Sequence, residues 1–266
     1  MQDIYEEMIV ACRNMAASFP SPRFYSRCRS WLELSRSAYD QNWQVRRCRE
    51  LILPELRDNF GHGMGHAEKV AVEAGALAYL EGERLSLGDG PRHEAGILAQ
   101  MAGLLHDLRR GEKEHAKASA AAAGKILAER SFMAAEQVKY IVEAIANHEA
   151  FVEPKRVDST VGQMISDALY DADKFRWGPD NFTFTLWRML RFSQAPIVRL
   201  IKRFPGGMKG IARVKRTFRS EAGKTYGPEF IDLGLQIGEK IYQWLQERFA
   251  AELQAEGKKE NVEGNR

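Results

Sequence analysis

An adjacent histidine and aspartate, His106 and Asp107, follow a strongly apolar helical stretch of the sequence. Apolar residues recur at helical spacing over 97–105, so this helix should bury the face on which the pair stands. An unpaired carboxylate near a protein core is costly, and a divalent metal would remove that cost by binding both imidazole and carboxylate. The structural alternative is an ordinary core histidine beside an aspartate that pairs with Arg109 or Arg110.

A second histidine, His66, stands in the first turn of a helix expected over 64–84. His62 lies four residues earlier, which is the histidine spacing of zinc-protease helices. Those helices need a glutamate directly after the first histidine, and Gly63 stands there instead. We therefore favour His66 over His62 as a metal ligand, because a helix would hold it rigidly.

Three aspartates lie on or near the buried face of a helix expected over 160–175, namely Asp167, Asp171 and Asp173. Acids so close to an apolar face need partners, which a metal or a cluster of arginines would supply. We select Asp173, directly after Ala172, as the metal ligand and keep Asp171 as the reserve.

The set His66, His106-Asp107 and Asp173 resembles the H…HD…D signature of the HD superfamily of metal-dependent phosphohydrolases. The run HGMGHAEKV resembles the family's opening H-x3-H-x2-R/K-V, LLHDL its central pair and DADKF its closing motif. The resemblance covers about residues 59–180, and weakly the C-terminal helix around 228–250. It implies an all-α HD-domain helical bundle in which these four residues hold a divalent metal: Mn, Fe, Co, Ni, Mg or Zn.

The resemblance also suggests a second metal at His115 and His148. Some HD proteins use histidines in these contexts to hold a second metal with the bridging aspartate, and others let them bind substrate phosphate. This chain has His148-Glu149 where the binuclear pattern often has two adjacent histidines, so we expect one tight metal and a weaker second site. The structural alternatives are an exposed surface histidine at 115 and a satisfied core histidine at 148.

The implied reaction is hydrolysis of a nucleotide or other small phosphoester by metal-activated water. Asp107 would bind the metal through one oxygen and orient the attacking water through the other; Lys113, His115 and His148 are the further candidate catalytic residues. Other basic residues near the motifs could offset phosphate charge: Arg109, Arg110, Lys117 and Lys174. Two alternatives come from other classes. A di-iron oxygenase of the HD fold would need both His115 and His148, and a non-catalytic ligand-sensing module is disfavoured by the intact ligand set.

The elements that must position these residues are all helices. Apolar spacing predicts them over 3–18, 24–38, 42–52, 64–84, 92–108, 115–130, 133–148, 160–175, 180–192, 196–204 and 228–252, with turns at 88–91, 178–179 and 205–207. We expect an N-terminal helical extension over 1–58, an HD-type metal-binding core over 59–180 and a C-terminal helical addition over 181–252. The charged tail, 253–266, is expected to be disordered.

Composition narrows the function classes. The 266-residue chain has no apolar run long enough for a membrane span, and its first 20 residues do not resemble a signal peptide. Cys12, Cys28 and Cys48 are odd in number and lack C-x2-C spacing. This argues against a disulfide framework and against a thiolate zinc site, and it fits a protein of the reducing cytoplasm.

Charge points to a small anionic partner. The net charge of +3 does not predict a nucleic-acid partner, but residues 199–224 hold nine basic residues and one acid. This segment is either a solvated helix face or a rim that attracts an anionic substrate. We expect a small phosphoester as partner, with no nucleic acid and no membrane, and leave a homodimer open.

Overall fold

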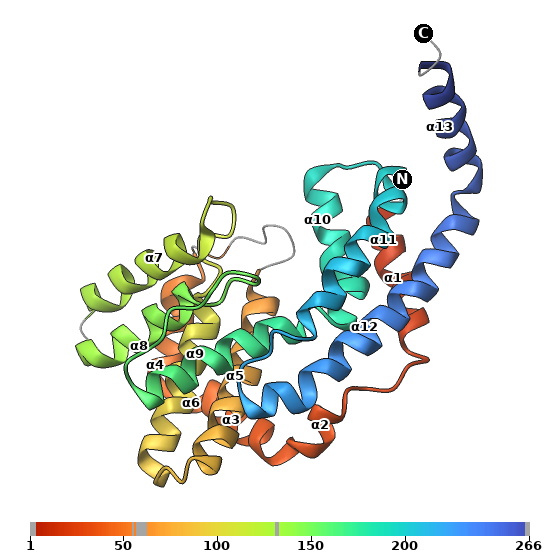
Figure 1. Ribbon diagram of the computed structural model, residues 1–266. Coiled ribbons are helices and arrows are strands. Elements are labelled where there is room, and N and C mark those ends of the chain that lie inside the picture. The colour runs from red at the N-terminus through yellow and green to blue at the C-terminus, as the bar shows by residue number, and fades with distance from the viewer. Residues whose placement is uncertain (1–3, 55, 57–62, 131–132, 264–266) are drawn as a thin grey trace.

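A computed structural model describes residues 4–54, 56, 63–130 and 133–263. This part of the chain forms helices without a strand, which confirms the expected all-α class (Figure 1). Across the same residues, no helix is both long enough and apolar enough to cross a bilayer. Cys12, Cys28 and Cys48 are buried free cysteines.

The helices fall into three successive groups along the chain. The first is α1 (Ile4–Ala16), α2 (Arg23–Arg27), α3 (Arg29–Gln41) and α4 (Trp43–Ile52). The second is α5 (Met64–Arg84), α6 (Asp89–Leu105), α7 (His115–Arg130), α8 (Ala135–Ala146) and α9 (Thr160–Phe175). The third is a π-helix, η1 (Asn181–Thr185), followed by α10 (Leu186–Ser193), α11 (Ile197–Val214), α12 (Glu221–Arg248) and α13 (Ala250–Glu263).

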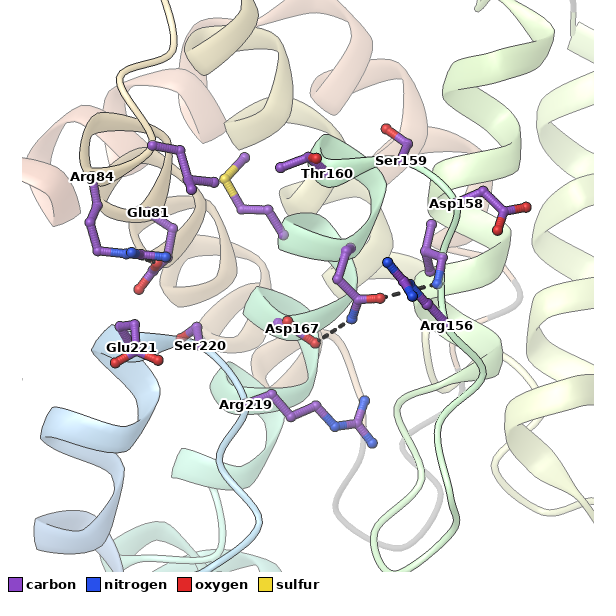
Figure 2. A pocket seen from close by; sticks show the side chains of 14 residues that line it. Glu81, Arg84, Arg156, Asp158, Ser159, Thr160, Asp167, Arg219, Ser220 and Glu221 are labelled. Carbon is purple, nitrogen blue, oxygen red and sulfur yellow. Dashed lines mark hydrogen bonds and ion pairs between the residues drawn. The ribbon is translucent and has the colours of Figure 1, made fainter.

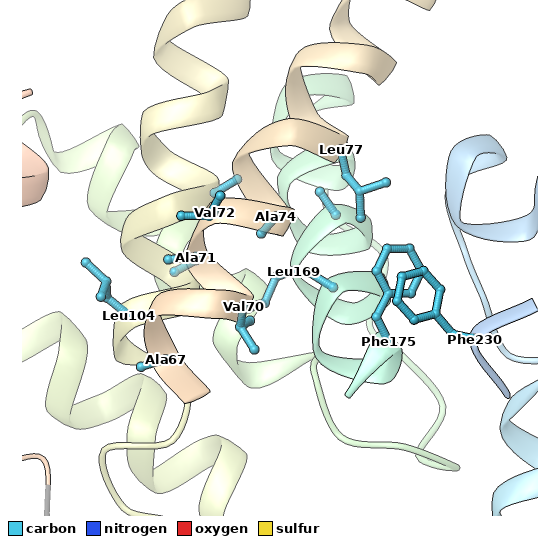
Figure 3. Close-up of a cluster of buried hydrophobic side chains, with 14 of the residues drawn as sticks. Ala67, Val70, Ala71, Val72, Ala74, Leu77, Leu104, Leu169, Phe175 and Phe230 are labelled. Carbon is cyan, nitrogen blue, oxygen red and sulfur yellow. The ribbon is translucent and has the colours of Figure 1, made fainter. Parts of the chain in front are cut away.

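Helix α5 lies at the centre of the core, packed between α6, α9 and α3. It is rich in alanine and glycine, so neighbouring backbones approach it closely. A Cβ at Gly103 of α6 would lie 2.6 Å from the Ala71 Cα, closer than atoms can approach. Figure 3 shows α5 side chains meeting Leu104 and Leu169, with Phe175 and Phe230 stacked beside them at 4.1 Å between ring centroids. This close packing fixes the relative positions of the helix ends that carry the histidines and aspartates.

The two ends of the chain pack against each other as well as against the core. Helix α1 contacts η1, α10 and α12, while α12 also contacts α9 and α5. Ion pairs join α1 to the C-terminal region, including Arg191 Nη1 to Glu6 Oε1 at 2.9 Å. Helix α1 and the C-terminal helices therefore form one wall beside the core, at the α12 side of Figure 1, whereas α3 and α4 pack on α5 and α6.

Several sequence expectations differ from the structure; α6, for instance, begins at Asp89, inside the turn predicted at 88–91. The predicted turn at 205–207 is wrong, because α11 continues to Val214. Its buried residues Ile201, Phe204, Ile211 and Val214 share one face, so packing outweighs the low helix propensity of the exposed Pro205-Gly206-Gly207. Helix α12 begins at Glu221 rather than 228, because the Ser220 side chain caps its first turn by accepting from the Gly223 N–H. Residues 253–263, for which charge predicted disorder, continue as the helix α13.

Candidate metal centre

Five buried side chains of metal-ligand type converge where several helix ends meet. His66 comes from the first turn of α5, His106 caps the end of α6, and Asp107 follows it. His148 lies just after α8, and Asp173 lies in the last turn of α9. Two groups of these residues have ligand atoms close enough to share an ion: His66, His106 and Asp173, and His106, Asp107 and His148.

The first group surrounds one point between α5, α6 and α9. The Nε2 atoms of His66 and His106 are 3.2 Å apart. Asp173 Oδ1 lies 3.5 Å from His66 Nε2 and 3.6 Å from His106 Nε2. Asp107 Oδ2 lies 3.4 Å from His106 Nε2 and 3.8 Å from His66 Nε2. Two imidazoles and two carboxylates therefore face the same small volume.

The other oxygen of Asp107 faces a second set of residues. Oδ1 lies 3.5 Å from His148 Nε2, 3.9 Å from His115 Nε2 and 3.7 Å from Arg110 Nη1. Within the described chain, Asp107 Oδ1 and His148 Nε2 are buried without a hydrogen-bond partner. Buried polar atoms are rarely left unsatisfied, so this pair marks a place where a ligand would be stabilised. The carboxylate of Asp107 thus stands between two groups of nitrogen atoms, in the position of a bridge.

The two deepest histidines are oriented by the same local device. His106 Nδ1 lies 2.7 Å from the Gly103 carbonyl, and His148 Nδ1 lies 2.6 Å from the Ile145 carbonyl. Each carbonyl belongs to the last turn of a helix, where the i+4 donors of the helix run out, although the Ile145 oxygen also accepts from the His148 N–H at 3.3 Å. The Nδ1–H donates to that oxygen, so Nε2 of each ring is directed into the cluster and is the atom that would bind a metal from the neutral ring. This tautomer is the one that metal-binding histidines use.

The cluster has the electrostatics of a site that requires a cation. Burial would lower the pKa of His106, but the charges of Asp107 and Asp173 outweigh it and raise the pKa to about 10. Burial would likewise raise the pKa values of Asp107 and Asp173, but His106 and, for Asp173, Lys174 hold them well below the usual range. Without a metal, the two carboxylates thus retain a proton on His106. A metal would compete with that proton for the same atoms.

Two basic residues donate hydrogen bonds to side chains of the cluster. Lys174 is buried and donates to Asp173 Oδ2 at 2.5 Å, which leaves Oδ1 toward the histidines. Arg110 Nη1 donates to His115 Nε2 at 2.8 Å. Burial and the nearby Arg110 charge lower the pKa of His115 to about 4, so its ring is neutral at physiological pH. The sequence had suggested Lys174 only as a neighbour of a phosphate, and Arg110 either in that role or as a partner of Asp107.

The remaining candidates lie elsewhere. Asp171 is buried away from the cluster, where it accepts from the Arg219 N–H, the Ser220 N–H and the Ser220 hydroxyl. Lys113 is exposed in the turn before α7. Lys117 pairs with Glu114, Arg109 lies near Glu112, and Asp167 accepts from Gln163. His62 falls outside the described residues.

A cavity of about 500 Å³ opens beside His66, and no pattern in the sequence indicates it. Its wall includes Lys69 of α5, Arg13 of α1 and Phe184 of η1, so three separate segments build it. The Arg13 guanidinium lies over the Phe184 ring at 5.4 Å. π-Helices are rare and are often found at functional sites, which fits the position of η1.

A network of charged residues forms part of the cavity wall through Arg176 and Asp180. Arg176 pairs with Glu73 and Asp180, and the hydroxyl of Tyr25 donates to Glu73 Oε1 at 2.8 Å. Arg176 is thus neutralised by two carboxylates, while Lys69 lies 3.2 Å from Asp180. The sequence signal that could have found the network is the acid Glu73 within the apolar stripe of α5.

Comparison of the chain with protein-family models, with curated proteins and with solved structures gives no match. The structure therefore establishes an all-α fold with a buried histidine and aspartate cluster that is compatible with a metal site.

Proposed function

We propose that this chain is an HD-type metal-dependent phosphohydrolase that acts on a nucleotide or another small phosphoester. One observation carries the proposal: buried imidazoles and carboxylates converge with their lone pairs turned inward, and the basic side chains that touch them approach from outside. Such a set suits divalent first-row metals.

The tighter metal site is formed by His66, His106, Asp107 and Asp173. These residues meet at distances of 3.2–3.8 Å in the structure and include both carboxylates of the cluster. Lys174 keeps Asp173 oriented, and the Gly103 carbonyl keeps His106 oriented. Outer partners of this kind raise metal affinity.

The second site, at Asp107 Oδ1, His148 and His115, is weaker. Only one carboxylate oxygen serves it, and the lone pair of His115 already accepts a hydrogen bond from Arg110. A metal would have to displace Arg110 from His115. A substrate phosphate could instead receive hydrogen bonds from Arg110 itself, which keeps the alternative role of these residues open.

A divalent ion in this centre would supply an activated water and withdraw charge from a phosphoryl oxygen. The chain's own contribution is position and charge. Asp107 directs one oxygen to each half of the centre, so the oxygen that does not bind the first metal is placed to orient the attacking water. The cavity beside His66 gives a phosphoester access, and Arg13 and Lys69 bring positive charge to its wall. Lys113 is a weaker candidate, because its side chain is exposed in the turn before α7.

The test is metal analysis combined with a substrate screen. Metal-free protein is reloaded separately with Mn, Fe, Co, Ni, Mg and Zn, and each form is assayed against nucleoside phosphates and simpler phosphomonoesters and diesters. We expect metal-dependent release of phosphate or of a nucleoside phosphate, lost in His106→Ala. His93→Ala is the matched control, because His93 is an exposed histidine of α6 that contacts Tyr79 rather than the cluster.

Two results would refute this function in different ways. Two tightly held irons with oxygen-dependent oxidation of a C–H bond would assign the di-iron oxygenase, for which His115 and His148 are both in reach of Asp107. Full metal loading without turnover of any phosphoester would leave a metal-binding module and remove the hydrolase.

A further inference from the structure

A second cavity, of about 320 Å³, lies where the first turns of α9 and α12 approach the end of α5 (Figure 2). Its wall is formed by Glu81, Arg84 and Leu85 of the α5 end, by residues 156–160, 163, 164 and 167, and by residues 219–221. None of the residues that we assign to the metal centre contributes to this wall. The cavity therefore calls for an explanation of its own.

Some of the charges around the cavity are already neutralised. Arg84 Nε pairs with Glu81 Oε2 at 2.7 Å, and Glu81 Oε1 accepts from the Ala222 N–H at 2.7 Å. Glu221 pairs with Lys224 at 2.7 Å. These groups hold α12 against α5 and have little capacity left for a ligand.

Arg219 is different, because this half-buried cation forms no ion pair with a carboxylate of the described residues, although the charges of Asp167, Asp171 and Glu153 act on it from farther away. It is also the only one of the nine basic residues between 199 and 224 that is not exposed. Its guanidinium stacks over the Tyr170 ring at 3.5 Å, and Nη1 donates to the Asn147 carbonyl at 2.8 Å. A guanidinium has five N–H donors in a planar fork suited to a carboxylate. Most of these donors remain available to a ligand.

Asp167 supplies the opposite charge in the same cavity. Its Oδ1 accepts from Gln163 Nε2 at 2.9 Å, and Gln163 in turn accepts from the Val157 N–H at 3.0 Å. No cation of a described residue forms an ion pair with this half-buried carboxylate. Figure 2 shows Asp167 between the α5 end and Arg219, with its hydrogen bond to Gln163 drawn.

The cavity thus presents an unpaired cation and an unpaired anion that are not bonded to each other. A simple anion would satisfy Arg219 and face the charge of Asp167, and a simple cation would do the reverse. A ligand with both charges close together satisfies both. The volume is at the lower end of small-molecule sites, which span roughly 300–1,000 Å³, so the ligand must be small. Leu85, Val157 and Met164 give the wall an apolar part.

We propose that this cavity binds a free α-amino acid with an apolar side chain. The carboxylate of the ligand pairs with the Arg219 guanidinium, and its ammonium group donates to the free oxygen of Asp167. The apolar side chain packs against Leu85, Val157 and Met164. Arg156 and Asp158, which are exposed at the rim, are not needed for this recognition.

The test is calorimetric titration of the full chain with apolar α-amino acids and with isosteres that lack one charge. For leucine, 4-methylpentanoate lacks the ammonium group and 3-methylbutylamine lacks the carboxylate. We expect at least one apolar amino acid to bind and both of its isosteres to bind at least roughly tenfold more weakly, because each loses a charge-assisted hydrogen bond. The measurement needs no metal and no turnover, so its outcome is independent of the proposed hydrolase.

The decisive variant is Asp167→Asn, which keeps the size of the side chain and leaves the Arg219 contact to Asn147 in place. It should weaken amino-acid binding roughly tenfold or more, while Asp40→Asn, an exposed aspartate of α3, should leave binding unchanged. Arg219→Gln should abolish binding, with Arg203→Gln on the exposed face of α11 as its control. Unfolding curves recorded without ligand separate loss of binding from loss of fold.

Three outcomes would overturn the proposal. Equal binding of 4-methylpentanoate and leucine would make the cavity a plain anion site. Binding that survives Asp167→Asn would place the ligand elsewhere. No heat signal with any apolar amino acid at millimolar concentration would leave the cavity without the ligand class that we assign to it.

Discussion

Asp171 and Asp173 lie two residues apart on α9, and their replacement by asparagine should affect metal binding differently. Asp173→Asn removes a carboxylate that faces His66 and His106 at 3.5 and 3.6 Å. Asp171→Asn removes a carboxylate that accepts three hydrogen bonds from residues 219 and 220. The first variant should lose metal, and the second should keep it.

The size of the Asp173→Asn effect follows from its two oxygens. Loss of an outer partner of a ligand alone lowers metal affinity roughly 10–100-fold, so loss of the ligand itself should lower it at least as much. Oδ2 also pairs with buried Lys174 at 2.5 Å, and breaking a buried ion pair costs roughly 3–5 kcal/mol. The lower end of this range applies to Asp173→Asn. The asparagine oxygen can still accept a hydrogen bond from Lys174, and the Tyr170 and Trp177 rings remain 5.0 and 5.8 Å from the Lys174 Nζ.

The assay is metal content after equilibrium dialysis, together with urea unfolding of the metal-free proteins. Adding Lys174→Met to Asp173→Asn should restore stability, because no unpaired buried charge remains, but it should not restore metal binding. The reasoning is refuted if Asp171→Asn loses the metal while Asp173→Asn retains it.

Asp171 also predicts a pH dependence of stability. Burial raises its pKa to about 7 in the folded state, against the hydrogen bonds that lower it, from an ordinary value of 3.8. The folded protein therefore binds this proton more tightly than the unfolded chain. Stability from this group is fully present below about pH 4 and is lost as pH rises toward 7, by up to about 4 kcal/mol. Asp171→Asn should lack that slope. The free energy of unfolding of the wild type minus that of the variant should therefore fall as pH rises across this window; a constant difference would contradict the raised pKa.

Three further outcomes follow from the structure. His106→Ala and Asp107→Ala should each abolish metal-dependent hydrolysis while circular dichroism stays α-helical; retained turnover with bound metal would remove the central role of the pair. His115→Ala and His148→Ala should each lose one of about two metal equivalents at saturating metal if they hold a second ion, or lose roughly ten- to a hundredfold in kcat/KM at unchanged occupancy if they bind phosphate. Gly103→Ala should destabilise the protein by about 1–3 kcal/mol in thermal unfolding, because its Cβ would lie 2.6 Å from a backbone atom of α5.

The sequence predicts most of the helices and the members of the cluster. The expected ranges 64–84, 115–130 and 160–175 coincide with α5, α7 and α9, because apolar spacing is regular there and no proline falls inside. The structure also brings His66, the His106-Asp107 pair and Asp173 together, as their shared motif order predicts. Their metal binding and catalytic roles remain predictions that the variants above test.

The orientation of the groups could not be predicted. No pattern in the sequence indicates that Lys174 donates a hydrogen bond to Asp173, or that Arg110 donates one to His115. Such contacts depend on how helix ends meet in space. Helix α11 passes through Pro205 for the same reason, since its burial against α12 is not visible in local propensity. The disorder expected for 253–266 rested on charge and on the lack of large apolar residues, neither of which excludes the helix that 253–263 form.

The cavity beside His66 has a wall drawn from distant parts of the chain, which bears on the order in which the protein assembles during synthesis. Arg13 lies on α1, whose ion pair between Glu6 and Arg191 spans 185 residues of sequence. Helix α1 leaves the ribosome early, but its partners η1, α10 and α12 are made only after the whole histidine and aspartate cluster. Because a nascent chain folds from its N-terminus as it is synthesised, the cluster residues can gather before the wall over them is complete. The wall of the cavity is then completed only when the C-terminal helices pack against α1.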